Sequence, residues 1–186
     1  HLPVAGETTK GSTLRFGPGG KGSNQMTAAH RAGSQVKIIG YRGNDVLGQI
    51  LKAHYEREQM SEEYVTVDDA AETGSALIEI DESDAQNRII VIFAANEQVT
   101  EARVLAAEKD FATADAVLTQ FETTTEAVFA TKALAQKYGK PFILNPAPFI
   151  DVPKELFRGV DYVTPNETEA EQFTGVSVAT QDDCRK

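Results

Sequence analysis

The sequence has a single cysteine, no long hydrophobic run and fewer basic than acidic residues. Cys184 alone cannot form an intrachain disulfide, which suits a reducing compartment, and we expect a cytoplasmic protein. No apolar run reaches the roughly 18 residues of a transmembrane helix, so we expect none. Acidic residues number 28 and basic residues 18, for a formal net charge of -10. Because this charge would repel nucleic acids and anionic membranes, we expect neither as a partner.

What is present is enough for a folded domain. The chain has 186 residues, of which 41% are hydrophobic and 25% charged, as in ordinary soluble proteins. It begins with His1 rather than methionine, and residues 180–186 resemble the first turn of another helix. We therefore expect the sequence to be part of a longer protein.

A glycine-rich stretch, GPGGKGSN at residues 17–24, stands before a segment predicted to be helical, residues 25–31. Glycines let the backbone adopt positive φ and approach another molecule closely, and a helix N-terminus presents N–H groups to anions. Lys21 and Asn24 could add donors to hydroxyls or to a phosphate. The alternatives are a tight loop without a ligand and a solvated Lys21.

Two nucleotide-binding motifs fit this stretch poorly. Gly17, Gly19 and Gly22 have the spacing of the dinucleotide-binding fingerprint, but that motif needs a buried strand before it and an acidic residue at a strand end about 20 residues later. Here the preceding strand is amphipathic, and Asp45 is placed as a helix cap. A Walker P-loop is excluded, because Lys21 is followed by glycine instead of serine or threonine.

Hydrophobic periodicity predicts helices and short strands along the whole chain. Strands alternating with helices favour βαβ units and a parallel sheet, and two alternating segments separated by a polar connector, residues 81–87, favour an antiparallel hairpin. Asp45 is a predicted helix cap, and Thr123 with Glu126 is a predicted capping box. The predicted strands are 7–16, 36–39, 65–67, 75–80, 88–93, 116–119, 142–144 and 162–163, and the predicted helices are 25–31, 46–59, 101–109, 125–138 and 167–173, with a short helix from Pro153.

Polar residues follow three successive predicted strands of the second half. Glu122 follows the first, Asn145-Pro146-Ala147-Pro148 the second, and Asn166-Glu167-Thr168-Glu169 the third. The carboxyl ends of parallel strands meet at one sheet edge, where α/β proteins bind ligands. Glu122 could instead be a surface residue, and the third group could merely cap a helix.

Several segments, taken together and in order, resemble the ribokinase-like carbohydrate kinases. The resemblance covers essentially the whole chain. It rests on PVAGET at residues 3–8, GGKGSNQ at 19–25, TGSA at 73–76, QFE at 120–122, NPAP at 145–148 and TPNETEAE at 164–171.

The resemblance implies a fold and a site. The fold would be a ribokinase-like α/β domain, mainly a parallel sheet flanked by helices, with a small antiparallel β lid. Residues 1–16 would be a lid strand segment, 17–73 and 96–186 the α/β domain, and 74–95 the lid hairpin. Expected sugar ligands are Gly20, Lys21, Gly22, Ser23, Asn24 and Glu122. Asn166 would lie beside the nucleotide phosphates, and Glu169 would help to position Mg²⁺ through water.

The implied reaction is phosphorylation of the 5-hydroxyl of D-ribose by ATP with Mg²⁺, in a homodimer joined through the lid. The family's catalytic Asp, adenine pocket and K⁺ site lie in a C-terminal part, and an Asn-x-Asp pair lies in a first strand. Neither part is in this sequence, so we expect no catalytic residue in it and no activity from the 186 residues alone. The alternatives are another sugar or nucleoside kinase of this family and a non-catalytic sugar-binding or scaffold protein.

Overall fold

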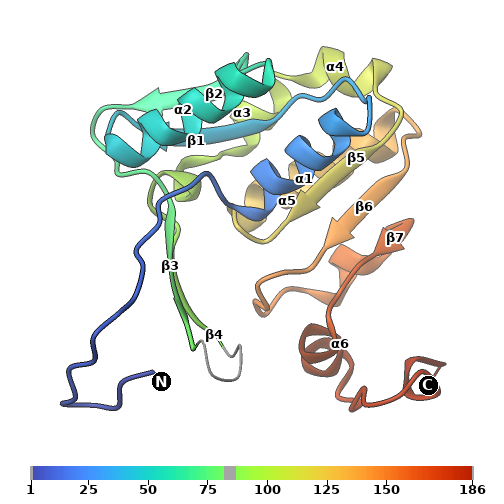
Figure 1. Ribbon diagram of the computed structural model, residues 1–186. Helices are drawn as coiled ribbons and strands as arrows, with labels where there is room; N and C mark the ends of the chain where they lie inside the picture. Colours follow the sequence, from blue (N-terminus) through green and yellow to red (C-terminus); the bar gives the residue numbers. More distant parts are fainter. Residues whose placement is uncertain (1, 82–86, 186) are drawn as a thin grey trace. The chain divides into compact units, whose positions relative to one another are not determined.

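The structure, a computed structural model, describes residues 2–81 and 87–185 (Figure 1). The chain divides into two compact units, one ending at Ala95 and the other starting at Asn96. Both units contain parallel strands, and the first also contains an antiparallel pair. The predicted combination of parallel strands, flanking helices and a small antiparallel sheet is confirmed.

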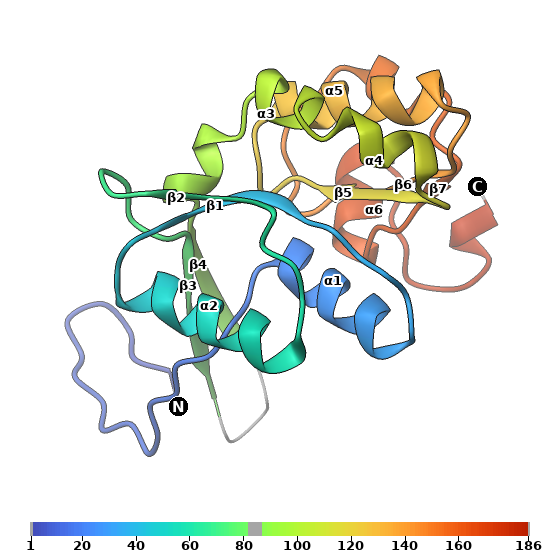
Figure 2. The ribbon, with the colours of Figure 1, turned by 90° about the horizontal axis from the view of Figure 1, so that it is seen from above.

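The first unit is built on two parallel strands covered by two helices. β1 and β2 pair from Ile39 opposite Tyr64 to Gly43 opposite Asp68. Figure 2 shows both helices on the same side of these strands. Met26 of α1 and Tyr55 of α2 are buried in one cluster with Met60, and this cluster joins the helices to the sheet. The elements are α1 (Lys21–Arg31), β1 (Ile39–Gly43), α2 (Val46–Glu58) and β2 (Tyr64–Asp68).

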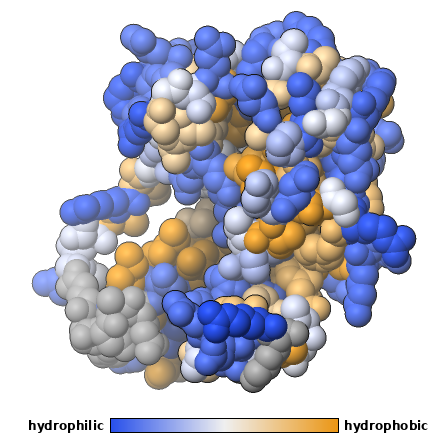
Figure 3. Space-filling model, turned by 90° about the vertical axis from the view of Figure 1, so that its right-hand side faces the viewer, coloured by the Kyte–Doolittle hydropathy of each residue, from blue (hydrophilic) through white to orange (hydrophobic). Residues whose placement is uncertain are grey.

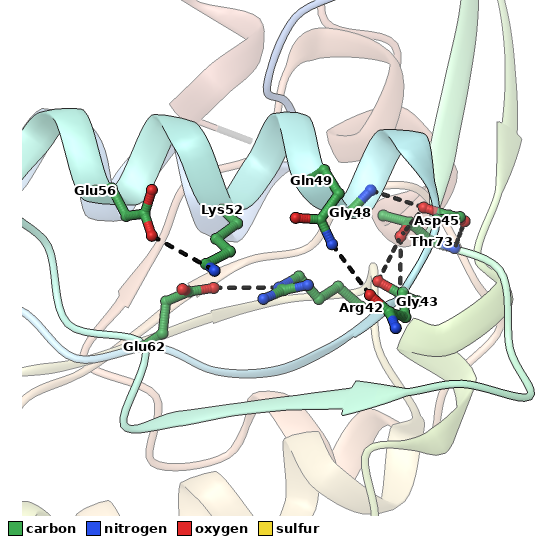
Figure 4. Close-up of polar contacts among 10 residues, drawn as sticks. Arg42, Gly43, Asp45, Gly48, Gln49, Lys52, Glu56, Glu62 and Thr73 are labelled. Atoms are coloured by element: carbon green, nitrogen blue, oxygen red, sulfur yellow. Dashed lines mark hydrogen bonds and ion pairs between the residues drawn. The ribbon is translucent and has the colours of Figure 1, made fainter.

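Asp45 connects three segments of this unit (Figure 4). It is the N-cap of α2, as predicted, and accepts a hydrogen bond from the Gly48 N–H at 2.7 Å. It also accepts from the N–H and the hydroxyl of Thr73, both at 2.7 Å. The Thr73 hydroxyl in turn accepts from the Gly43 N–H at 2.9 Å. The end of β1, the start of α2 and the segment before β3 are thereby held together.

The antiparallel ribbon consists of β3 (Ser75–Ile80) and β4 (Asn87–Ile92). Leu77 pairs with Ile90 and Ile78 with Ile89, and these two pairs lie on opposite faces because side chains alternate along a strand. All four side chains are more than half exposed. The ribbon is therefore apolar on both faces. Most of the predicted connector, residues 82–86, lies outside the described residues.

The second unit contains the three parallel strands β5, β6 and β7, in that order. α5 packs against β5, β6 and α3, and the buried side chains include Val128, Phe142 and Leu144. The elements are α3 (Glu101–Leu105), α4 (Glu108–Thr113), β5 (Val117–Gln120), α5 (Thr125–Lys137), β6 (Phe142–Asn145), β7 (Tyr162–Val163) and α6 (Glu167–Thr174), with 3₁₀ helices at Ala94–Gln98, Lys154–Phe157 and Asp183–Arg185.

Several local predictions were wrong. The strand predicted at residues 36–39 is β1, which starts at Ile39 and runs to Gly43. Residues 7–16 form no strand, and Leu14 and Phe16 are 76% and 71% exposed, because the weak alternation has no pairing strand beside it among the described residues. The predicted helix 101–109 is two short helices, α3 and α4. The cap of α5 is Thr124, which accepts from the Ala127 N–H, so the box predicted from Thr123 is absent.

Candidate functional site

The glycine-rich turn leads directly into α1, which begins at Lys21 and not at residue 25 as predicted. Gly20, just before the helix, has a φ of 87°, a left-handed conformation that glycine adopts without steric penalty. This single residue is enough to redirect the chain into the helix, and the prediction wrongly extended the turn to Asn24. Residues 21–24 therefore form the first helical turn.

The start of α1 presents hydrogen-bond donors. The Asn24 N–H donates to the Gly20 carbonyl at 2.9 Å, so the helical bonding pattern starts there and gives the earlier N–H groups no intrahelical acceptor. Gly20 supplies no capping side chain. The Asn24 side chain is exposed and Lys21 is partly exposed, whereas Ser23 is buried. Such an end can bind a hydroxyl group or an anionic oxygen.

α2 holds this first turn from the side. Ser23 forms a hydrogen bond with the side chain of Tyr55, whose pKa is raised mainly by burial. The Thr27 hydroxyl donates to the Ser23 carbonyl at 2.8 Å and lies 3.0 Å from Nε2 of His54. Nδ1 of His54 is 3.0 Å from a guanidinium nitrogen of Arg57. The first turn of α1 is thus fixed by two residues of α2.

A groove of about 370 Å³ runs along this contact between α1 and α2. Its lining residues are Pro18, Asn24, Thr27, Ala28, Arg31, His54 and Arg57. Arg31 binds the Glu58 carboxylate, at 2.8 Å from Nε to Oε2, and this hydrogen bond lowers the pKa of Glu58. Since Glu58 offsets the charge of Arg31, the groove is less basic than its two arginines suggest.

In the second unit, the carboxyl ends of three strands meet at one sheet edge. Gln120 of β5 is opposite Asn145 of β6, and the Asn145 amide donates to the Thr164 carbonyl after β7 at 2.7 Å. Phe121 donates its N–H to the Ala147 carbonyl at 2.9 Å. Glu122 follows directly and is partly exposed. The register therefore brings together the strand ends from which Glu122 and the NPAP segment start.

Asn166 and Glu169 form a complete capping box at the start of α6. The Asn166 side chain accepts from the Glu169 N–H at 2.7 Å, and Glu169 accepts from the Asn166 N–H at 2.9 Å. Glu169 is buried and Asn166 is exposed. The structure therefore confirms the helix-cap interpretation of Asn166, which is compatible with a ligand beside the helix N-terminus.

Glu169 could contact a metal ion only through a metal-bound water. Oε2 of its carboxylate is hydrogen-bonded to the Asn166 N–H, and Oε1 remains for a metal-bound water. Within residues 2–81 and 87–185, no group of three or more His, Cys, Asp or Glu side chains is arranged to hold a metal ion. This arrangement fits a water-mediated contact and gives no complete metal site.

The predicted site residues fall into two groups. Gly20, Lys21, Gly22, Ser23 and Asn24 lie together in the first unit, and Glu122, Asn166 and Glu169 lie in the second. Sequence patterns did not identify Thr27, which bonds to Ser23 of the first group, or His54, which bonds to Thr27. A histidine inside an amphipathic helix carries no sequence signal of its partner, which here is 27 residues away.

Residues 1–186 match the pfkB family of carbohydrate kinases. The chain belongs to this family. Among pfkB relatives, the ribokinase of Haemophilus influenzae is 36% identical over 179 residues, 96% of this chain and 58% of the relative. The ribokinase of Bacillus subtilis is 36% identical over 168 residues, 90% of this chain and 57% of the relative. The chain thus spans less than two thirds of the length of these relatives.

The solved structures place the pfkB chain in the ribokinase-like fold. Arabidopsis thaliana ribokinase, complexed with ribose and ATP, superposes with a TM-score of 0.83 at 27% identity. That match covers 100% of this chain and 60% of the Arabidopsis chain. The helices of the described part of this family member include none long and apolar enough to cross a bilayer.

Proposed function

We propose that the protein containing this chain is a ribokinase, which transfers the γ-phosphoryl group of ATP to the 5-hydroxyl of D-ribose. The observation that carries the proposal is the glycine turn. Gly20 has positive φ and places Lys21 and Asn24 on the first turn of a helix, within a sequence that is similar to ribokinases over nearly its full length. A start of this kind presents N–H, ammonium and amide groups, which suit a polyhydroxylated ligand.

The sugar contacts are assigned residue by residue. Lys21 and Asn24 would bind ribose hydroxyls with their side chains, and the backbone of Gly20, Gly22 and Ser23 would supply N–H donors. Glu122 would accept hydroxyl hydrogen bonds. A carboxylate that accepts from two hydroxyls fixes the orientation of a sugar ring more tightly than a single neutral bond does.

The phosphate contacts are assigned to the start of α6. Asn166 would lie beside the ATP phosphates, where the helix N-terminus favours negative charge. Glu169 would position Mg²⁺ through a bound water. Its Oε1 can accept a hydrogen bond from this water while Oε2 accepts one from the Asn166 N–H. When bound, Mg²⁺ neutralises charge on the phosphate oxygens. A monovalent cation such as K⁺ belongs to the proposal for the whole protein, and none of these residues is assigned to it.

These eight residues bind and orient the reactants. Phosphoryl transfer depends mainly on alignment and on stabilisation of charge, so correct placement of the 5-hydroxyl accounts for much of the rate. Removal of the hydroxyl proton is assigned to none of them.

Asn24→Ala tests the sugar contacts. In the protein expressed from its complete reading frame, losing one neutral hydrogen bond should raise the KM for ribose by about 3- to 10-fold, with KM for ATP unchanged. Asn44→Ala is the matched control, because Asn44 is an exposed asparagine of the same unit that donates to Asp69. Equal KM values for ribose in the two variants would refute the assignment of Asn24.

We propose further that the protein forms a homodimer through the β3–β4 ribbon. In the ribbon, Ile80 and Ile90 are 64% and 61% exposed. Hydrophobic residues also lie on the face of the molecule drawn in Figure 3. Because the ribbon is apolar on both faces, one face can bind a second copy of the protein even when the other covers a ligand. Ile90→Lys and Ile89→Lys alter opposite faces, and light scattering should show a monomer for one of them. Dimers in both variants would contradict the proposal.

A further inference from the structure

His54 is a buried histidine in the middle of a defined chain of hydrogen bonds. The residue is 6% exposed, and each ring nitrogen has a partner. Nδ1 is 3.0 Å from the Arg57 guanidinium, and Nε2 is 3.0 Å from the Thr27 hydroxyl. The Thr27 hydroxyl is also 2.8 Å from the carbonyl of Ser23. The chain therefore ends on the turn that carries Asn24.

The donors in this chain fix the state of the histidine ring. A guanidinium has only donors, so Nδ1 of His54 must accept from Arg57. The proton of a neutral ring is then on Nε2, which donates to the Thr27 oxygen. The Thr27 hydroxyl is left to donate to the Ser23 carbonyl. All three bonds are satisfied at once only when His54 is neutral.

Protonation of the ring would break the first bond of the chain. It would place an N–H on Nδ1 against the Arg57 donor and a positive charge beside Arg57, while Nε2 would keep the proton that it donates to Thr27. Protonation can therefore weaken the bond to Thr27 only by shifting the ring. The charged groups facing the ring are Arg57 and Glu58 of its own helix and Arg31 of α1. Burial lowers the pKa of His54, both arginines lower it further, and Glu58 opposes them. The lowered pKa and the hydrogen-bond pattern both favour the neutral ring.

We propose that His54 is a positioning residue for the sugar-binding turn: through Thr27 it holds the Ser23 carbonyl and Asn24 in their binding geometry, and its protonation weakens this hold by pushing the ring away from Arg57. That the ligand of this turn is a sugar rests on the proposed function. The link between α2 and the first turn of α1 rests on the hydrogen bonds alone. The consequence is a sugar affinity that falls in acid.

The first test is the KM for ribose as a function of pH, from about pH 5 to about pH 8, in the protein from the complete reading frame. The wild-type KM should rise in acid by about 3-fold or more, the effect of one lost hydrogen bond. His54→Gln keeps an amide donor toward Thr27 but does not titrate, so this rise should be absent. His54→Ala and Thr27→Val should have a raised KM at every pH, whereas Thr27→Ser should match wild type. His30→Gln, a histidine of α1 outside the chain of bonds, is the control.

The second test is NMR of the histidine rings and of the backbone amides of residues 21–24. We expect the Nε2–H tautomer for His54, and amide shifts in the first turn that follow its titration in wild type and not in His54→Gln. Two results would overturn the inference. One is a His54 ring protonated on Nδ1 at neutral pH, and the other is a ratio of the wild-type KM to the His54→Gln KM that does not change with pH. If neither wild type nor any variant phosphorylates ribose, the proposed function fails. Amide shifts of residues 21–24 that do not change as His54 titrates would overturn the link between His54 and the first turn of α1.

Discussion

Asp45 and Thr73 are joined by two hydrogen bonds of 2.7 Å, one from the Thr73 N–H to Oδ2 and one from its hydroxyl to Oδ1. The residues are 28 positions apart, and Thr73 lies two residues before β3. One carboxylate thereby caps α2 and fixes the base of the antiparallel ribbon.

Asp45→Ala should lower the free energy of unfolding by about 2 kcal/mol, the combined effect of a lost cap and of unsatisfied donors. The hydrogen bond from the Thr73 N–H, followed by that from Gly48, lowers the pKa of Asp45. A carboxyl whose folded pKa lies below its unfolded value of about 3.9 adds stability above that pH, and this stability is lost as the pH falls through the folded pKa. In urea denaturation, the free energy of unfolding of Asp45→Asn should therefore fall less between neutral and acidic pH than that of wild type. Asp115→Ala, an exposed carboxyl, is the control, and equal stability of Asp45→Ala and Asp115→Ala would contradict the prediction.

Gly48→Ala should destabilise the protein although alanine favours helices. A Cβ at Gly48 would lie 2.1 Å from the Gly43 carbonyl oxygen and 2.9 Å from the Thr73 hydroxyl. The clash with backbone should cost about 2 kcal/mol or more, beyond the gain of about 1 kcal/mol from helix propensity. Gly40→Ala is the control, since nothing lies within 4 Å of its added Cβ. A thermal melt in which Gly48→Ala is as stable as wild type would show that β1 and α2 are not in close contact.

Arg42→Met should leave stability unchanged or raise it slightly. Arg42 is 5% exposed and pairs with Glu62 at 3.2 Å, while its buried Nη1 has no hydrogen-bond partner among the described residues. Burying a partly satisfied guanidinium is costly, so an apolar side chain of similar length can replace it without loss. A loss of more than about 2 kcal/mol in chemical denaturation would mean that Arg42 has a partner in solution.

Phe173→Ala should loosen α6. The Phe173 ring is 4.7 Å from that of Phe149, 5.1 Å from Phe157 and 6.3 Å from Phe121, between centroids. Removing these contacts should cost about 2 kcal/mol and speed hydrogen exchange in α6 relative to α5. Tyr162→Ala, with a side chain that is 63% exposed, is the control. Unchanged exchange in α6 would mean that its position does not depend on this cluster.

Much of the fold follows from local patterns in the sequence. Strand β3 occupies the predicted residues 75–80, and Asp45 and Asn166 cap the predicted helices, because alternation and capping chemistry act over a few residues. The strand predicted at residues 7–16 failed because a strand needs a pairing partner as well as a pattern. Likewise, four glycines obscured the start of α1 at Lys21, which depends on the φ of one residue.

Less of the candidate site could be predicted from the sequence. Residues 20–24 could be proposed as a site because the glycine turn is contiguous and resembles a family motif. Thr27 and His54 could not, since their contact depends on how α1 packs on α2. The same holds for Thr73, whose hydroxyl reaches Asp45 only once β1, α2 and the ribbon base are assembled.

The central claim is tested most directly by measuring kcat/KM for ATP-dependent phosphorylation of D-ribose, D-fructose and adenosine by the protein from its complete reading frame, with NMR of the product to locate the phosphate. We predict ribose 5-phosphate as the product and a kcat/KM for ribose at least about 10-fold above the other two acceptors, as expected when a polar site fits one substrate's hydroxyls. No ribose-dependent consumption of ATP, or a higher kcat/KM for fructose or adenosine, would contradict the account.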